Sequence, residues 1–463
     1  MNTPQSLMEV TGALSDRARG VRFTFGDDTM LVAVQHMLAQ TVDLFRALGE
    51  LGLKPSNIFA LGKIYSSNAT VISAIRDLGV TVLESTVPDP GRFDESFDED
   101  IKRLWALIAQ SLEVRRIKRI IVLDEGGNCV TNTPPELLRK YLFAGVEQTS
   151  RGIFIFEENP PPFAVFSWAR AAVKLEIGGH LFSHCLVDRL RNDFLNGRSL
   201  HGLEIGIAGL GSIGRGLAKL ALREGCRVAF YDPAAHCVVP ASLQDGLTRV
   251  DSLQELMLRC DYLLGASGRN PFEGRWPLAH RPGIKLISAS GGDHEFGPII
   301  RDLARTASFK IAADTWDISS EHGPSGPVHI AFLGYPYNFV SRAEAAVPTR
   351  VVQLETGGLL AGLIQARTYL TLVEQGYERN AGIHRISPKA QRFVFETWLR
   401  AMEEQGIDVR EIYGYDPALL EATKRRDWFA DHSEPGSRLG NGSISRLEAV
   451  MSRMVNHDRQ VGR

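Results

Sequence analysis

A glycine-rich turn between two apolar stretches is the clearest chemical feature of the sequence. Gly209, Gly211 and Gly214 have the spacing G-x-G-x-x-G, directly after an apolar stretch that ends at Ala208 and before a helical pattern. In such a strand–turn–helix unit the first glycine permits the tight turn, the second lets the backbone approach a pyrophosphate, and the third lets helix and strand pack closely. A turn that binds nothing is the alternative. We favour a binding turn, whose cofactor contacts are Gly209, Gly211, Ser212, Ile213 and Gly214.

An acidic residue closes the same unit. The apolar stretch Arg227–Tyr231 is followed by Asp232, which lies 18 residues after Gly214. A carboxylate at this place can accept hydrogen bonds from both hydroxyls of an adenosine ribose, and it would repel a 2′-phosphate. The free N–H groups at the start of the helix attract the pyrophosphate. We therefore expect NAD, in preference to NADP, as the cofactor.

The composition limits the class of protein. The chain has 463 residues, and its 52 Lys and Arg against 54 Asp and Glu give a formal charge of −2, so no nucleic-acid partner is expected. No apolar run approaches the ~20 residues of a membrane span, and the first twenty residues lack the apolar region of a secretory signal. The cysteines are odd in number and lack C-x-x-C spacing, which favours reduced thiols in the cytoplasm. They are Cys129, Cys185, Cys226, Cys237 and Cys260.

Strand and helix patterns alternate over most of the chain, which predicts an α/β protein with parallel sheets. The predicted strands are Asn57–Leu61, Val80–Leu83, Arg119–Leu123, Phe163–Phe166, Glu204–Ala208, Arg227–Tyr231, Tyr262–Leu264, Lys285–Ser288 and Lys310–Ala312. One sheet does not easily hold so many strands. We therefore expect two Rossmann-like, doubly wound domains, joined by a hinge helix at Ala169–Asn196. Further helices are expected at Ala69–Leu78, Ile101–Leu112, Gly357–Gln375 and 387–405.

Short segments on both sides of the glycine turn together resemble the adenosylhomocysteinase (S-adenosylhomocysteine hydrolase) family. Before the turn these segments are His36-Met37 with Thr41, Ile64–Asn68, Leu123–Gly127 and Gly145–Gly152; after it they are Gly265–Gly268 and Gly382–Lys389. Their order and spacing agree with that family from about residue 30 to about residue 400.

The resemblance implies a domain organisation. A substrate domain at residues 30–178, completed by 349–405, would be hinged to an NAD-binding domain at 179–348. Residues 1–29 would form an N-terminal tail and 406–463 a C-terminal extension. The implied partner is a nucleoside-like small molecule, with neither nucleic acid nor membrane, and a homo-oligomer is left open.

The resemblance also implies a chemistry. NAD takes a hydride from a hydroxyl-bearing carbon of the substrate, while acid–base side chains in a closed cleft move the protons. His36, Glu125 and Lys174 would be catalytic. The further residues implied to contact the cofactor are Thr149, Ser150, Ser267 and Gly268.

Other positions that are catalytic in that family hold different residues here: Gln148, Gly178, Gly179, Gly292 and Val347. Each lost general acid or base is worth about 10²–10⁴-fold in rate. We therefore expect oxidation of a nucleoside- or polyol-like hydroxyl with altered specificity, not ordinary hydrolysis of S-adenosylhomocysteine. Two alternatives remain: a catalytically lapsed regulatory protein that binds NAD or a nucleotide, and a dehydrogenase of the D-2-hydroxyacid type.

Overall fold

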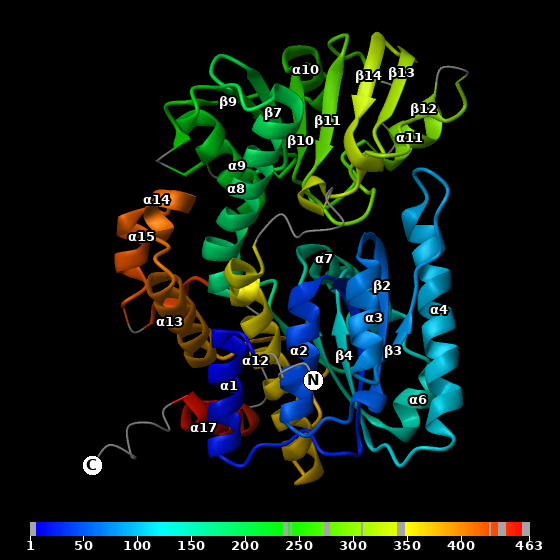
Figure 1. The fold of residues 1–463 in the computed structure, drawn as a ribbon, viewed down its shortest axis with the longest axis vertical. Coiled ribbons are helices and arrows are strands. Elements are labelled where there is room, and N and C mark those ends of the chain that lie inside the picture. Colours follow the sequence, from blue (N-terminus) through cyan, green and yellow to red (C-terminus); the bar gives the residue numbers. More distant parts are fainter. Residues whose placement is uncertain are drawn as a thin grey trace. The chain divides into compact units, whose positions relative to one another are not determined.

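The structure, a computed structural model, describes residues 6–234, 239–240, 243–272, 278–306, 309–339, 348–425, 427–433 and 441–455. Cys237 and Val347, named above, lie outside these ranges. The chain divides into two compact units (Figure 1). Unit 1 comprises Met1–Ser85, Asp98–Gly178 and Pro348–Arg463, and unit 2 comprises Thr86–Phe97 and Gly179–Val347.

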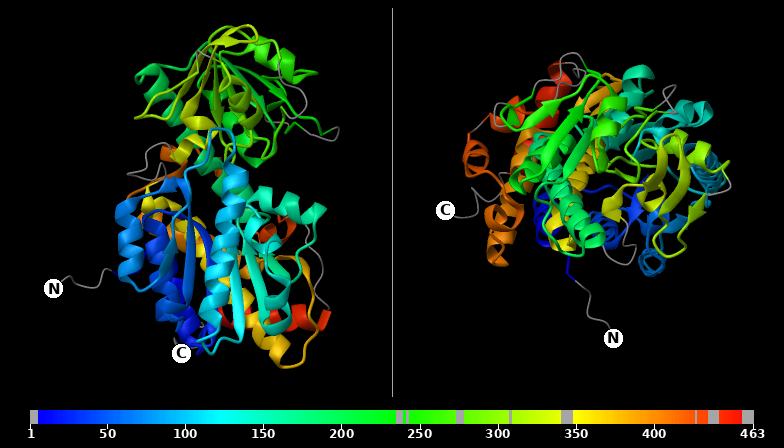
Figure 2. Two further views of the ribbon diagram at one scale, coloured as in Figure 1. Left: turned by 90° about the vertical axis from the view of Figure 1, so that its right-hand side faces the viewer. Right: turned by 90° about the horizontal axis from the view of Figure 1, so that it is seen from above.

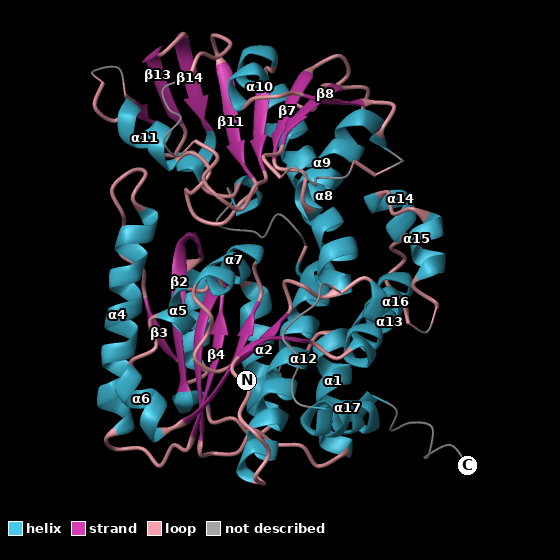
Figure 3. Ribbon diagram, turned by 180° about the vertical axis from the view of Figure 1, so that it is seen from behind, coloured by secondary structure: helices cyan, strands magenta, loops and turns pink. Residues whose placement is uncertain are grey.

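Unit 1 is built on a seven-stranded sheet whose neighbouring strands are all paired in parallel (Figure 3). The strand order is β15-β6-β5-β4-β1-β2-β3. The chain order therefore reverses between β1 and β4, and ligands of open α/β sheets bind beyond the carboxyl ends of the strands at such a switch point. The strands are β1 (Thr29–Met37), β2 (Ile58–Ser67), β3 (Thr81–Leu83), β4 (Arg119–Asp124), β5 (Leu142–Glu147), β6 (Ala164–Ser167) and β15 (Gly382–Arg385).

Helices lie on both faces of this sheet (Figure 2), and the central strand β4 is buried along its whole length. This burial explains the apolar run Ile120–Leu123 within it, since a strand covered on both faces needs no polar alternation. The helices are α1 (Glu9–Gly20), α2 (Ala39–Glu50), α3 (Ala69–Asp77), α4 (Phe93–Leu112, entering from unit 2), α5 (Asn128–Thr131), α6 (Pro135–Lys140), α7 (Ser150–Glu158), α12 (Thr349–Glu374), α13 (Pro388–Glu404), α14 (Val409–Tyr413), α15 (Pro417–Ala422), α16 (Trp428–Asp431) and α17 (Asn441–Val455).

Unit 2 has an eight-stranded mixed sheet with the order β12-β13-β14-β11-β10-β7-β8-β9. From β14 to β9 the neighbours are parallel, whereas β13 pairs antiparallel with both β12 and β14. Its switch point lies between β7 and β10. The elements are α8 (Gly179–Arg189), β7 (Glu204–Ala208), α9 (Ser212–Arg223), β8 (Arg227–Tyr231), β9 (Leu247–Arg249), α10 (Leu253–Arg259), β10 (Tyr262–Gly265), β11 (Ile284–Ser288), α11 (Gly297–Leu303), β12 (Lys310–Ile311), β13 (Ile318–Gly323) and β14 (Gly326–Ile330).

The predicted fold class is confirmed: the protein is α/β with two doubly wound sheets, although the second sheet is mixed. The expected hinge helix differs in detail, because π-helical turns at Val173–Gly178 and Leu190–Phe194 flank α8. The expected N-terminal tail contains helix α1, which buries Val10 and Leu14 within unit 1. The expected C-terminal extension also falls within unit 1.

Helix α12 is buried almost throughout and packs closely because of two glycines. A Cβ on Gly358 would overlap the indole ring of Trp168, and one on Gly362 would lie 3.0 Å from side-chain atoms of Ile386 and Val146. The small-residue spacing in this segment thus serves packing between the helix and the sheet.

No helix among the described residues is long and apolar enough to cross a membrane. Four cysteines are described, and all are buried free thiols: Cys129, Cys185, Cys226 and Cys260. Burial raises the pKa of the Cys260 thiol to about 12. These cysteines therefore act as small core residues.

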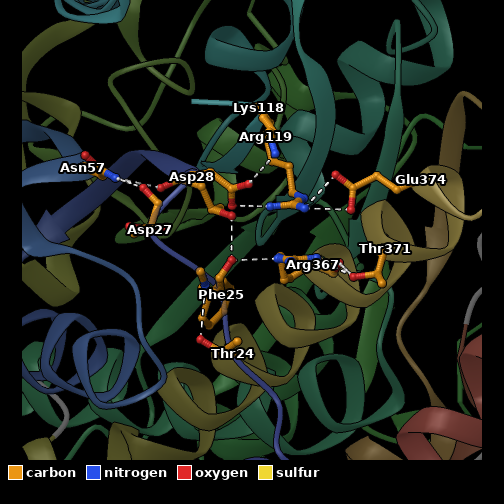
Figure 4. A network of polar contacts seen from close by, with 12 residues as sticks. Thr24, Phe25, Asp27, Asp28, Asn57, Lys118, Arg119, Arg367, Thr371 and Glu374 are labelled. Carbon is orange, nitrogen blue, oxygen red and sulfur yellow. Dashed lines mark hydrogen bonds and ion pairs between the residues drawn. The ribbon is translucent and has the colours of Figure 1, made fainter. Parts of the chain in front are cut away.

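A polar network ties α12 to the amino-terminal end of the unit 1 sheet (Figure 4). Arg119, at the start of β4, forms ion pairs with Asp28 and with Glu374 on α12, the latter at 2.7 Å. Arg367 donates to the carbonyl oxygen of Phe25 at 2.8 Å. Ligands of such sheets bind at the carboxyl ends of the strands, whereas this network lies at the amino-terminal ends. We therefore assign the network a structural role.

Replacing Arg119 by methionine should destabilise the protein by about 2 kcal/mol or more, because two partly buried carboxylates would lose their shared counter-ion. The measurement is the free energy of unfolding in urea. Lys118→Met is the matched control: Lys118 is 72% exposed and lies 3.6 Å from Asp28, so its loss should cost under about 0.5 kcal/mol. Equal effects of the two variants would contradict the structural role of Arg119.

Candidate cofactor and acid–base sites

The glycine turn of unit 2 connects β7 to α9 at the switch point of that sheet. Gly209 has φ +96°, a conformation that L side chains rarely adopt, and a Cβ there would lie 2.6 Å from the Cα of Ser267. A Cβ on Gly214 would overlap the carbonyl oxygen of Gly209. A Cβ on Gly211 would meet no protein atom within 4 Å. Two glycines are therefore required by the fold, whereas Gly211 leaves open space beside the backbone.

That open space fits a pyrophosphate. Helix α9 starts at Ser212, and its N-cap Gly211 makes no side-chain capping bond. The N–H groups of the first helical turn form a site for anions. Asp232, directly after β8, accepts hydrogen bonds from the backbone N–H of Leu210 at 2.7 Å and of Ala234 at 2.9 Å. Each carboxylate oxygen has a further lone pair with which to accept from a ribose hydroxyl. The residues present fit a bound dinucleotide.

The turn after β10 lies on the other side of this switch point and is held by a buried carboxylate. Glu295 accepts hydrogen bonds from the backbone N–H groups of Ser267 at 2.8 Å and Gly268 at 3.1 Å. The predicted cofactor residues Ser267 and Gly268 therefore direct these N–H groups to Glu295. They shape the turn that lies against Gly209.

The switch point of unit 1 holds three charged or titratable side chains. His36 comes from β1, Lys63 from β2, and Glu125 directly follows β4. One carboxylate oxygen of Glu125 lies 3.0 Å from Nζ of Lys63, and the other lies 3.1 Å from Nε2 of His36. The Nδ1 of His36 is 2.5 Å from the hydroxyl of Ser66. His36, Lys63 and Glu125 thus form a connected acid–base cluster.

Burial and charge give the members of this cluster different roles. The side chains of Glu125 and Lys63 are 4% and 5% exposed, against 18% for His36. Burial acts to raise the pKa of Glu125, but the charges of His36 and Lys63 outweigh it and lower that pKa to about 2. Burial likewise acts to lower the pKa of Lys63, and Glu125 outweighs it and raises that pKa. Glu125 and Lys63 therefore remain an ion pair, and His36 is the most exposed member of the cluster.

The loop that presents Glu125 is itself held by two buried carboxylates. Asp124 accepts from the backbone N–H groups of Glu125 and Val130, both at 2.8 Å. Glu147 accepts from the N–H groups of Gly126 at 3.2 Å and Gly127 at 3.1 Å. Burial raises the pKa of both carboxyls. Asp124 and Glu147 thus fix the backbone on which Glu125 stands.

The structure brings together His36 and Glu125, two of the three residues predicted to be catalytic, but gives the other residues predicted in unit 1 different partners. Lys174 lies 2.8 Å from Glu355 on α12, which also accepts from Trp168. Thr149 caps α7 by accepting from the N–H of Gly152 and donates its hydroxyl to Glu147. Ser150 is exposed at the start of α7.

Lys63 and Glu295 are the main residues that the sequence analysis missed. Lys63 stands within a strand whose other residues are mostly apolar, and a lysine in a buried strand is itself a sign of a paired charge. Glu295 lies seven residues past β11, and no spacing rule links it to Ser267. No group of three or more His, Cys, Asp or Glu side chains that could hold a metal ion occurs in the part of the chain that the structure describes.

A comparison with protein families matches residues 184–270 to the NAD-binding domain of D-isomer specific 2-hydroxyacid dehydrogenases. This match includes β7, the glycine turn, α9 and Asp232. Taken with the geometry above, it shows that unit 2 contains a Rossmann-type NAD-binding domain. NAD is therefore confirmed as the cofactor.

Comparisons with whole proteins give more distant likenesses. The chain is 27% identical over 368 residues to the uncharacterized protein Rv0104 of Mycobacterium tuberculosis, covering 76% of this chain and 68% of that one. Among solved structures, it is similar to the A chain of dipicolinate synthase from Bacillus subtilis (10% identity, 76% and 99% of the two chains, TM-score 0.34). It is also similar to NAD+-bound 3-phosphoglycerate dehydrogenase from Entamoeba histolytica (13% identity, 75% and 96% of the two chains, TM-score 0.34).

These findings bear differently on the prediction of an NAD-binding domain and on the prediction of a family. The NAD-binding Rossmann domain is confirmed, and its family model belongs to dehydrogenases. None of these matches supports the resemblance to adenosylhomocysteinase, or the hydrolase activity that it implies. Among the interpretations of the sequence, the D-2-hydroxyacid type of dehydrogenase is the better supported.

Replacing Asp232 by serine should weaken NAD+ binding about tenfold, because the ribose hydroxyls lose an ionised hydrogen-bond acceptor. It should also reduce the preference of the protein for NAD+ over NADP+, because the charge that repels a 2′-phosphate is gone. Dissociation constants for both cofactors, measured by calorimetry, check this. Asp245→Ser removes an exposed carboxylate of the same unit and should leave both constants unchanged. A variant at 232 that still rejects NADP+ as strongly as the parent would contradict the role of Asp232.

Proposed function

We propose that the protein is an NAD-dependent oxidoreductase that interconverts a hydroxyl group and a carbonyl group on a small polar molecule. The observation that supports this most is the cofactor turn of unit 2, within the match to the NAD-binding domain of a dehydrogenase family. Unit 1, taken by itself, contains the His36–Lys63–Glu125 cluster, whose side chains can move a proton. Hydroxyl oxidation needs both a hydride acceptor and a proton acceptor.

In this proposal His36 is the general base. It accepts the proton of the substrate hydroxyl at Nε2 during oxidation, since Nδ1 lies 2.5 Å from the hydroxyl of Ser66, and it returns that proton during reduction. Glu125 stays ionised, fixes the ring and stabilises the imidazolium, while Lys63 holds Glu125. A dinucleotide held at the glycine turn and Asp232 would supply the hydride acceptor for the carbon that bears the hydroxyl. The catalytic role of Lys174 stays a separate prediction.

The family model favours a 2-hydroxy acid and its 2-oxo acid as the substrate pair over a nucleoside. The charge near the cluster is consistent with this choice. A Cβ on Gly126 would lie 3.7 Å from Nζ of Lys63 and 3.9 Å from Cδ of Arg151. Lys63 is neutralised by its ion pair with Glu125, so Arg151 is the cationic side chain here that would attract a substrate carboxylate.

The experiment is a substrate screen with the purified full chain. NADH formation from NAD+ is followed with a panel of D-2-hydroxy acids and a panel of nucleosides and polyols, and turnover is expected in the first panel. With the substrate found, His36→Gln should lower kcat by about 10²–10⁴-fold. His201→Gln, at an exposed histidine of unit 2, should leave kcat unchanged. NAD binding without turnover of any panel member would contradict the proposal and favour a regulatory protein.

A further inference from the structure

Glu295 is a fully buried carboxylate beside the cofactor turn of unit 2. One of its oxygens, Oε1, accepts four hydrogen bonds: from the N–H and hydroxyl of Ser267 at 2.8 and 3.0 Å, from the N–H of Gly268 at 3.1 Å and from the hydroxyl of Ser290 at 2.6 Å. The other oxygen, Oε2, has no hydrogen-bond partner among the described residues. A Cβ on Gly265 would lie 2.7 Å from it, so the strand leaves room for this oxygen.

The carboxylate lies across the switch point from Asp232. The ribose acceptor Asp232 follows β8, and the pyrophosphate turn follows β7, so the adenosine half of the cofactor lies towards β8. A dinucleotide bound to this fold crosses the switch point, which directs its nicotinamide half towards β10 and β11. The residues that bond to Glu295 follow these two strands.

We propose that Glu295 is a positioning residue of the nicotinamide half of the cofactor site, and that its negative charge favours the cationic, oxidised ring over the neutral, reduced ring. The four hydrogen bonds hold the turn after β10 against Gly209. Burial raises the pKa of Glu295 to about 7, although these bonds lower it. Above that pH the carboxylate is ionised in a low-dielectric setting, where a charge acts over several ångströms.

Other charged groups of the same segment have partners of their own. Asp293 accepts from the backbone N–H of Phe93 at 3.2 Å, and His294 lies 2.7 Å from Asp94. Burial also raises the pKa of Asp293 to about 7. Asp293 is therefore a matched control: a buried carboxyl two residues away, with a similar pKa and no bond to the turn after β10.

The test measures dissociation constants of the full chain for NAD+, NADH and ADP-ribose by calorimetry, at about pH 8, where Glu295 is ionised. Glu295→Gln should weaken the binding of NAD+ about tenfold more than it weakens the binding of NADH. The dissociation constant for ADP-ribose, which lacks the nicotinamide ring, should change by the same factor as that for NADH. Asp293→Asn should leave the ratio of NAD+ to NADH affinity unchanged.

A Glu295→Gln protein whose three affinities fall by one common factor, or do not change, would overturn the charge preference. Ser290→Ala is the second variant, in case the first does not fold. It keeps the carboxylate and removes the 2.6 Å hydrogen bond, so the NAD+ to NADH ratio should move in the same direction by a smaller factor. An unchanged ratio in that variant would overturn the proposal as well.

Discussion

Glu125→Leu should lower the free energy of unfolding by about 3–5 kcal/mol, because it would leave the ammonium group of Lys63 buried without the carboxylate that pairs with it. Lys63 is 5% exposed and its Nζ lies 3.0 Å from Glu125. The single change therefore removes an ion pair and leaves an uncompensated charge. Denaturation in urea, followed by the fluorescence of the buried Trp168 and Trp105, measures this loss.

A double-mutant cycle separates the pair from a general effect of mutation. Lys63→Met alone should cost less, since Glu125 keeps its contact with His36. The double variant Lys63→Met/Glu125→Leu should regain most of the loss, because apolar side chains then fill the space of the pair. Glu84→Leu serves as the control: it breaks an exposed pair with Arg76 and should cost under about 0.5 kcal/mol. Additive effects of the two core changes would contradict a buried ion pair.

The same pair predicts a dependence on pH. The pKa of Glu125 falls from its ordinary 4.5 to about 2 in the folded protein, and this corresponds to about 3 kcal/mol. Since the ionised form is favoured in the folded state, this stability is fully present above about pH 4.5. It is lost as the pH falls towards 2. The Glu125→Leu protein should lack this component of acid sensitivity.

The strands that the sequence predicted well have one clear signal in their own residues. Glu204–Ala208 and Arg227–Tyr231 match β7 and β8 residue for residue, because a buried apolar run ends at a glycine turn in one case and at an aspartate in the other. Helix α12 was also expected, yet it begins eight residues before Gly357. Its start follows Pro348, and a proline N-cap is a weak signal next to the long apolar run that comes after it.

The strands that were missed lack an apolar run with a clear end in their own residues. β1 contains Gln35 and His36, and β5 contains the pair Ala144-Gly145, whose small residues also suit a turn. β15, at Gly382–Arg385, joins the edge of the unit 1 sheet from a distance of more than 200 residues in the chain. Pairing of this kind depends on tertiary contacts, which overrule local propensity.

The residues of the candidate sites likewise include some that have a local signal in the sequence and some that have none. The glycine turn and Asp232 follow a fixed spacing, so the sequence predicts them together. The catalytic roles of His36 and Glu125 were implied by a resemblance and not by spacing, and Lys63 joins them only because β1, β2 and β4 are neighbours in the sheet. Residues that meet by strand order in space leave no periodic trace in the sequence.

Gly211→Ala should weaken NAD+ binding at least tenfold while changing stability by less than about 1 kcal/mol. Gly211 has φ −72°, which alanine adopts without strain, and a Cβ there meets no protein atom within 4 Å. The added methyl group would occupy only the space in which the backbone approaches the pyrophosphate. Thermal denaturation and calorimetric titration with NAD+ measure the two effects separately.

Gly214→Ala is the matched comparison, because it lies three residues away but faces the protein. Its Cβ would overlap the carbonyl oxygen of Gly209, so stability should fall by about 2–3 kcal/mol through overpacking, and NAD+ affinity should fall with it. A Gly211→Ala protein that binds NAD+ like the parent would show that the cofactor does not approach this turn. The contrast thus distinguishes the glycine that the ligand requires from the glycine that the fold requires.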